Sequence, residues 1–215
     1  MDIQQEATRT SSTIVPLRAQ HLGDASELLA AAFFEYPVFT CYFPNPARRA
    51  RYLPWYLRNV VKCAQRYGEA WTNPENTGVL LTLPPGHTSL SIREYVRNGF
   101  LPAPLVLGLR SYLRSMECQE FVDRTQRQLM RGRHYYLWLV AVDPGRQGEG
   151  IGTALMQPFL ARADAEGVPV YLETHHERNV RYYERRGFSV LHETAVPKHN
   201  LPMWCLRSSP SLAGE

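Results

Sequence analysis

Three glycines at the junction between an apolar run and a helical pattern limit the folds open to this chain more than any other feature. The stretch VDPGRQGEGIGTAL covers residues 142–155 and places glycine at 148, 150 and 152. The run HYYLWLVAV before it is typical of a buried strand, and the pattern after it predicts a helix from about Gly150 to Gly167. A second buried strand, VPVYLE, follows at 168–173. Strand, loop, helix and strand form a βαβ unit, whose two strands lie parallel and adjacent.

The remaining segments predict a mixed sheet with helices on both faces. Further strands are expected in TIVPLR, EAWTN, GVLLTLPPG, FSVLHETAV and LPMWCLRS, and the last two should form an antiparallel pair. Apolar spacing predicts helices over 19–36, over roughly 47–67 and in RNVRYYERRG, with two or so more in an arginine-rich segment at 86–133. We therefore expect one α/β domain over residues 13–208, with a tail at 1–12 and another at 209–215.

Composition excludes several classes of protein. With 44% apolar and 20% charged residues the chain is typical of a globular protein, and no apolar run is long enough to predict a membrane span. Four widely spaced cysteines without a C-x-x-C pair argue against a metal site and favour a reducing cytoplasm. The net charge is +4, but the arginines are scattered, which is more typical of a solvated surface than of a nucleic-acid interface.

The glycine loop predicts a backbone that approaches a phosphate group closely. A P-loop is excluded because no lysine stands near the glycines. A dinucleotide-binding loop is a real competitor, since Glu173 ends the next strand, but Thr153 occupies the place of its third glycine. The pattern Q/R-x-x-G-x-G/A is met in full by residues 147–152. The N–H groups of residues 147–153, at the start of a helix, would then converge on a pyrophosphate.

This loop resembles that of the GCN5-related N-acetyltransferases, which use acetyl-CoA as co-substrate. The stretch NVRYYERRGF at 179–188 is similar to the N-x-x-x-Y-x-x-x-G-F element of the same family. AAAFFEYP, VPVYLETHHERNVRYYERRGF and WCLRSSP resemble its puromycin N-acetyltransferase branch. The likeness covers about residues 13–210 and is thin across 85–133. It implies a mostly antiparallel seven-stranded sheet whose central parallel pair splays for acetyl-CoA, with the helical insertion between strands 3 and 4.

The resemblance also implies a cofactor site. Backbone groups of Val140, Ala141 and Val142 would pair with the pantetheine arm, and a bulged N–H near Val140 would polarise the thioester carbonyl. Asn179 matches a family asparagine that contacts the cofactor, although asparagine is also a favoured helix N-cap. The loop and the last helix supply the rest of the expected cofactor site: Arg146, Gln147, Gly148, Gly150, Ile151, Gly152, Thr153 and Tyr183.

Proton transfer needs a general acid and a general base. Tyr183 holds the family position of the acid that protonates the departing thiolate, because a phenol with a pKa near 10 stays protonated at neutral pH. Tyr182 competes for this role. We expect Glu173 to be the base that receives the amine proton, and either His175 or His176 could replace it.

The acceptor side is expected in two aromatic clusters, FFEYPVFTCYF at 33–43 and YLPWY at 52–56. Tyr36, Glu35 and Trp55, together with Glu173, are the expected substrate contacts, and they suit an amphiphilic amine. The predicted function is acetyl transfer to a small-molecule amine, such as an antibiotic or toxin, by a monomer or homodimer. Two alternatives stay open: a non-catalytic CoA-binding protein, and acetylation of a peptide or protein amine.

Overall fold

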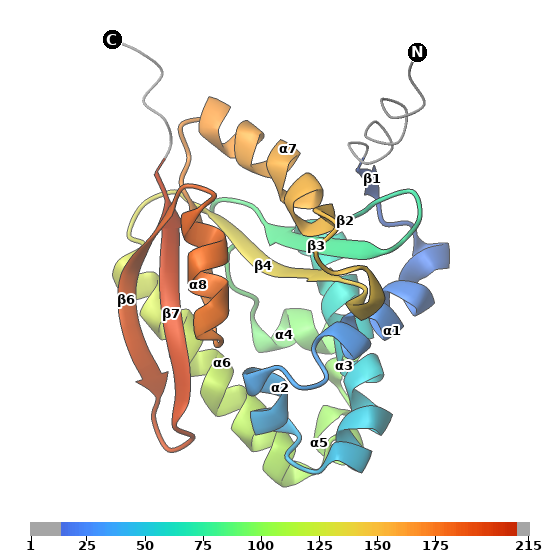
Figure 1. Cartoon of the computed structure of the whole chain (residues 1–215). Helices are drawn as coiled ribbons and strands as arrows, with labels where there is room; N and C mark the ends of the chain where they lie inside the picture. The colour runs from blue at the N-terminus through green and yellow to red at the C-terminus, as the bar shows by residue number, and fades with distance from the viewer. Residues whose placement is uncertain (1–13, 210–215) are drawn as a thin grey trace.

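The predicted strands assemble into one seven-stranded sheet, ordered β1-β2-β3-β4-β5-β7-β6 (Figure 1). The computed structural model describes residues 14–209, so the tail expected at 1–12, and all but Ser209 of the tail expected at 209–215, lie outside the described residues. Every neighbouring pair is antiparallel except β4 and β5, which confirms the mixed, mostly antiparallel sheet. The strands are β1 (Val15–Pro16), β2 (Glu69–Thr72), β3 (Gly78–Leu83), β4 (Tyr135–Val142), β5 (Val170–Thr174), β6 (Phe188–Val196) and β7 (Leu201–Ser208).

Helices cover both faces of the sheet because apolar side chains alternate along its strands. In β3, Val79 and Leu81 pack against the first helices of the chain, whereas Leu80 packs with α7 and α8 on the other face. α6 completes the first face, where its Val122 joins a cluster with Tyr171 of β5. The helices are α1 (Leu22–Ala32), α2 (Pro37–Tyr42), α3 (Pro46–Tyr67), α4 (Ile92–Tyr95), α5 (Ala103–Val106), α6 (Leu109–Leu129), α7 (Ile151–Ala165) and α8 (Glu177–Glu184). None of the helices within residues 14–209 is long and apolar enough to cross a membrane.

The helix expected over 19–36 does stop before Pro37, but it is shorter than predicted. A 3₁₀ turn precedes α1, which ends at Ala32, and α2 begins at Pro37. Tyr36 is extended, with φ −71° and ψ 134°, because the ring of a following proline disfavours the helical conformation. Tyr36 therefore leads into α2 instead of ending the first helix, and this turn directs it toward the end of β5.

The insertion lies between β3 and β4 as expected, and it holds α4, α5 and α6. After α4 a π-helical turn, Val96–Phe100, is broken at Gly99, whose φ of +105° disfavours any residue with a Cβ. The chain bends there and leads through α5 into the long helix α6.

The parallel pair β4–β5 separates soon after it forms. Its ladder holds Tyr135 opposite Val170 and Tyr136 opposite Tyr171. Beyond Tyr136, β4 pairs with β3 alone, and the two central strands diverge toward their carboxyl ends. This opening is the splay that the family resemblance implies.

β4 also contains a bulge, two residues before the place expected for it. Leu81 of β3 faces Leu139 and the next residue, Thr82, faces Leu137, so Trp138 is the extra residue. As a result Trp138 and Leu139 both pack on the α1–α3 side, and Val140 is turned toward α7. The expectation of a bulge at Val140 is corrected to Trp138.

Candidate active site

The glycine loop leaves the start of α7 open to an anion. Gly150 precedes the helix, has a φ of +82° and makes no side-chain cap, so the N–H groups of the first turn have no intrahelical partner. Gly148 has a φ of +92°. A Cβ added at either glycine would meet no protein atom within 4 Å. These glycines therefore face open space, and the loop fits a phosphate-bearing ligand that approaches from outside.

Charged residues flank this loop. Arg146 and Glu149 form an ion pair of 2.6 Å, with both side chains about half exposed. The Arg186 guanidinium of the segment after α8 donates to the Thr153 hydroxyl and lies 3.5 Å from the centre of the Tyr182 ring. A Cβ on Gly152 would stand 3.0 Å from the Tyr182 hydroxyl, so this glycine lets α8 approach α7 closely.

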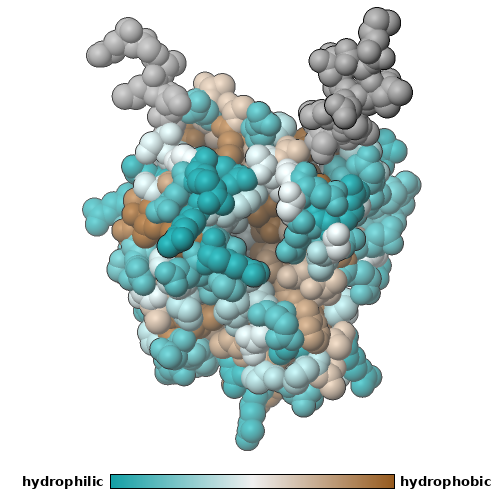
Figure 2. Space-filling view, viewed as in Figure 1, coloured by the Kyte–Doolittle hydropathy of each residue, from teal (hydrophilic) through white to brown (hydrophobic). Residues whose placement is uncertain are grey.

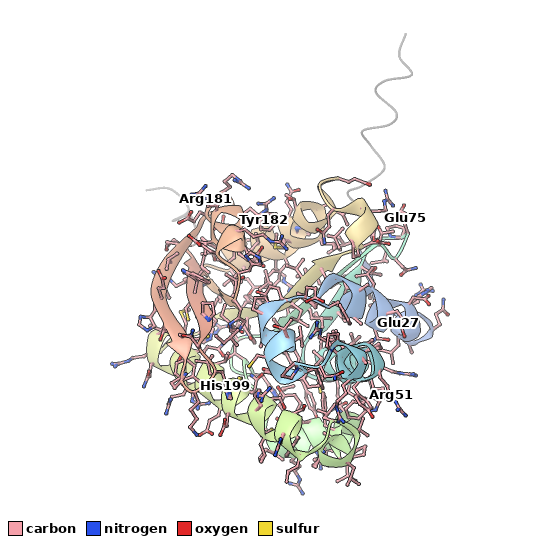
Figure 3. The ribbon with its side chains drawn as sticks, turned by 60° about the horizontal axis from the view of Figure 1, so that its bottom comes forward. Glu27, Arg51, Glu75, Arg181, Tyr182 and His199 are labelled. Atoms are coloured by element: carbon pink, nitrogen blue, oxygen red, sulfur yellow. The ribbon has the colours of Figure 1, made fainter. Side chains whose placement is uncertain are left out.

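The two neighbouring tyrosines of α8 point to different places. Tyr182, labelled in Figure 3, lies against the start of α7. Tyr183 is buried and lines a cavity at the splay between β4 and β5. Of these two tyrosines, Tyr183 is the one that lines the opening in the sheet, and its role as the acid stays a prediction.

This cavity, of about 100 Å³, collects side chains from both faces of the sheet. Neighbouring residues of a strand point to opposite faces of the sheet. Leu172 packs under α7 and α8, so Glu173 lies on the opposite face, with Tyr171 and α6. Tyr183 comes from the α7–α8 face. In the space-filling view, apolar residues lie in a recess at the centre of the molecule (Figure 2). The lining includes Tyr36, Phe39, Tyr42, Tyr56, Gln119, Tyr136, Trp138, Val140, Glu173, His175, Asn179 and Tyr183.

The Glu173 side chain is half-buried, and its carboxyl group is only partly satisfied. One carboxyl oxygen accepts a hydrogen bond from the Tyr136 hydroxyl, whereas Oε2 is buried without a partner. Burial raises the pKa of Glu173 to about 8; the Tyr136 hydrogen bond opposes that shift and the charge of Asp123 adds to it. A carboxyl group with this pKa takes up and releases a proton near neutral pH.

Burial also raises the pKa of Tyr183, and the nearby Tyr36, Tyr182 and Glu173 act in the same direction. The phenol therefore stays protonated at any physiological pH. Its ring is held between Tyr182 and Phe188, with centroids 5.3 and 5.7 Å away. A protonated phenol, Tyr183, and the Glu173 carboxyl group therefore line the same cavity.

A hydrogen-bond network fastens the end of β5 to α2 and α8. The Tyr36 hydroxyl lies 2.9 Å from the Thr174 hydroxyl and accepts from the backbone N–H of His175 at 2.9 Å. Asn179 donates to Thr174 at 3.1 Å. Because His176 holds the N-cap position of α8, the N-cap reading of Asn179 is wrong; Asn179 lines the cavity from inside the first turn.

The two histidines differ in environment. His175 is buried and lines the cavity; its Nδ1 lies 2.8 Å from the Pro202 carbonyl oxygen, and burial lowers its pKa to about 4. His175 is therefore neutral, donates through Nδ1 and is a weak base. His176 is half-buried before α8, is not among the residues that line the cavity, and has a pKa lowered chiefly by partial burial. Among these three side chains, only the pKa of Glu173 is raised; which of them is the base stays a prediction.

Two expected substrate contacts lie away from the cavity. Glu35 has a 73% exposed side chain and pairs with the buried Arg49 at 2.9 Å. Trp55 packs edge-on against Phe100 of the insertion, at 5.7 Å. Tyr36 does line the cavity, and among the expected pantetheine contacts Val140 does so too. Ala141 packs against the first helices, and Val142 faces α7.

Several cavity residues escaped the sequence reading. Tyr136 and Trp138 are two residues apart in one strand, which is the spacing of side chains on the same strand face. This spacing is the signal that could have found them. Gln119 comes from α6, and its approach depends on long-range packing that no local pattern reveals. Tyr56 of α3 belongs to the cluster at 52–56 that was expected on the acceptor side, and it lines the cavity.

Comparison with known proteins agrees with this geometry. Residues 112–188 match the model of the acetyltransferase (GNAT) family. An uncharacterized N-acetyltransferase of Schizosaccharomyces pombe is 25% identical over 178 residues, which cover 80% of this chain and 72% of that protein.

Solved structures share the fold. A histone acetyltransferase HPA2 and related acetyltransferase from Corynebacterium glutamicum superimposes with a TM-score of 0.65 at 20% identity, covering 95% of this chain and 99% of that one. Arylalkylamine N-acetyltransferase 2 from Aedes aegypti gives a TM-score of 0.56 at 13% identity, over 93% and 99% of the two chains.

The splayed parallel pair, the open glycine loop and the family match define an acyltransferase enzyme. More specifically, residues 112–188 are similar to the acetyltransferases of the GNAT family, whose members use acetyl-CoA.

Proposed function

We propose that this enzyme transfers an acetyl group from acetyl-CoA directly to the primary amine of a small molecule while both are bound. One observation carries the proposal. Glu173 and Tyr183, a carboxyl group poised near neutral pH and a protonated phenol, come from opposite faces of the sheet into one cavity at the splay. A reaction that removes one proton and supplies another at neighbouring atoms needs this pair.

The residues around the splay fit acetyl-CoA. The N–H groups that follow Gly148 and Gly150, with the dipole of α7, suit its pyrophosphate, and Arg146 and Thr153 stand beside them. Val140, Asn179 and Tyr183 line the opening that would hold the thioester end. When bound, acetyl-CoA supplies an activated acyl group. Gln147, Ile151, Gly152, Ala141 and Val142 remain part of this proposed cofactor site.

The proposed roles balance the protons. Glu173, as carboxylate, accepts the proton that the amine nitrogen loses when its bond to the acetyl carbon forms. Tyr183 donates its proton to the sulfur as the carbon–sulfur bond breaks. Transfer of the proton from Glu173 to the Tyr183 phenolate, relayed by water, restores both groups. Tyr36 walls the acceptor side and holds the end of β5 in place through Thr174.

The aromatic wall around Glu173 favours an amphiphilic amine over an acidic metabolite. From the stretches AAAFFEYP, VPVYLETHHERNVRYYERRGF and WCLRSSP we also infer a relationship to puromycin N-acetyltransferases. Puromycin is therefore one of the first amines to test. All four cysteines are free thiols, which supports a reducing compartment such as the cytoplasm.

The test is a panel of amines with acetyl-CoA, in which free thiol and acetylated product are both measured. The panel contains puromycin, arylalkylamines, linear polyamines and a short peptide with a free N-terminus. We expect turnover with at least one small amine. Turnover with the peptide alone would replace the proposed substrate class, and no turnover with any of them would refute the proposed function.

A further inference from the structure

The insertion between β3 and β4 forms a second hollow beside the catalytic cavity. This groove is lined by the α4–α5 segment and α6, and it has a volume of about 410 Å³. Figure 1 shows where these helices lie. Ligand pockets commonly have volumes of roughly 300–1,000 Å³. Most of its lining is apolar or aromatic, including Ile92, Tyr95, Val96, Phe100, Leu113 and Met116.

The groove adjoins the catalytic cavity. Tyr56 and Gln119 line both hollows. The Tyr56 ring lies 6.0 Å from Phe39 in the cavity and 5.3 Å from Phe100 in the groove, measured between ring centroids. One aromatic wall therefore runs from the cavity that holds Glu173 into the groove.

The groove is formed before any ligand arrives, because the insertion is fastened to α3. A Cβ at Gly99 would come within 2.5 Å of the Asn59 side-chain oxygen, so the bend lies directly on α3. Further along, Arg48 of α3 donates to the Leu107 carbonyl oxygen at 2.8 Å. Two separate contacts hold the α4–α5 segment against α3.

Carboxylates give the groove a negative character toward the catalytic cavity. Asp123 is half-buried and accepts from Gln119, the residue shared by the two hollows, at 2.9 Å. Glu120 lies exposed at the rim, and Glu117 is paired with Lys198 and His199. Arg127 is the cation in the lining. A cationic group would find its opposite charge at Asp123, where the groove meets the cavity.

We infer that this groove binds the apolar body of the acceptor, an alkyl or arylalkyl primary amine whose nitrogen passes Gln119 and Asp123 to reach Glu173. This inference rests on the proposed acetyl transfer to a small amine. It names the part of the molecule that selects the acceptor, and it explains why the insertion carries apolar side chains around a hollow.

The first test is a series of straight-chain primary amines from ethylamine to octylamine. Each methylene that enters an apolar site should raise kcat/KM about fourfold until the groove is filled. Leu113→Asp, in the groove, should flatten this dependence. Leu105→Asp is the matched control, because Leu105 is 88% exposed on the same insertion and lies outside the groove lining. In the control, kcat/KM should depend on the chain length of the amine as it does in the wild type. A wild-type kcat/KM that does not change with chain length would overturn the inference.

A binding measurement separates this inference from the proposed function. N,N-dimethyloctylamine is a tertiary amine and cannot form a stable amide, so it tests the groove without catalysis. By calorimetry it should bind the wild type and Leu105→Asp, and bind Leu113→Asp about tenfold more weakly. If no primary amine is acetylated but dimethyloctylamine binds the three proteins as expected, the proposed function is refuted and the inference that the groove binds the apolar part of an amine is still supported.

Two other outcomes would overturn the groove assignment. One is acetylation of primary amines together with dimethyloctylamine binding that is equal in all three proteins. The other is a dimer in light scattering that Leu113→Asp dissociates, which would show that a second copy of the chain covers the groove.

Discussion

Tyr182 and Tyr183 are adjacent, yet only one of them lines the catalytic cavity. Tyr183→Phe keeps the ring and removes the proton donor, so kcat should fall on the order of 10²-fold. The KM for acetyl-CoA should change little. Tyr182→Phe is the matched control and should keep most of the wild-type kcat in the same steady-state assay. Equal losses in the two variants would refute the assignment of the acid to Tyr183.

The raised pKa of Glu173 predicts a pH profile. Because burial raises it to about 8, the carboxylate needed as base accumulates only as pH approaches 8, and kcat/KM should rise up to that pH. Glu173→Gln should lower kcat/KM on the order of 10²-fold or more and remove this rise. A wild-type profile that is flat from pH 6 to 9 would show that Glu173 is not the base.

The same residue links stability to pH. A Glu whose pKa is raised on folding binds its proton more tightly in the folded state than in the unfolded state. Its contribution is fully present below the unfolded pKa of roughly 4.3 and is lost as pH rises through about 8. Glu173→Gln, which is always neutral, should therefore raise Tm relative to the wild type at pH 9 and not at pH 4, as measured by calorimetry. An equal Tm difference at the two pH values would argue against this shift.

At the scale of single elements, α7 offers a test of the glycine loop with an internal control. Gly150 and Gly167 flank the helix, both have positive φ, and a Cβ on either would meet no atom within 4 Å. Replacement by alanine should cost each variant a similar stability, about 1 kcal/mol, because both conformations disfavour a side chain. Only Gly150→Ala should lose the rise in Tm that acetyl-CoA produces. Loss of that rise in Gly167→Ala as well would remove the special role of the loop.

The elements also show how far sequence reasoning reaches. The βαβ unit around the glycine loop was predictable because its signals are local: an apolar run, crowded glycines and a helical period. The end of the first helical segment before Pro37 was predicted from the proline, but the earlier end of α1 at Ala32 and the new helix that begins at Pro37 were missed, because the apolar pattern continues through both. The bulge at Trp138 depends on how β3 pairs with β4, and the bond between Tyr136 and Glu173 joins two different strands, so neither follows from one stretch of sequence.

At the scale of the whole molecule, the sheet separates two tasks. α7 and α8 cover the face that carries the glycine loop, and α2, α3 and α6 cover the face on which we propose that the acceptor binds. The splay between β4 and β5 is where side chains of the two faces meet. Direct transfer at this splay therefore requires that acetyl-CoA and the amine are bound at the same time, each on its own side of the sheet.

The most direct test is the initial-velocity pattern with acetyl-CoA and the best amine of the panel, varied against each other. Binding of both substrates before any chemistry predicts double-reciprocal lines that intersect, and a protein mass that is unchanged after incubation with acetyl-CoA alone. Parallel lines, together with a protein heavier by one acetyl group, would contradict direct transfer between two substrates held in the same opening.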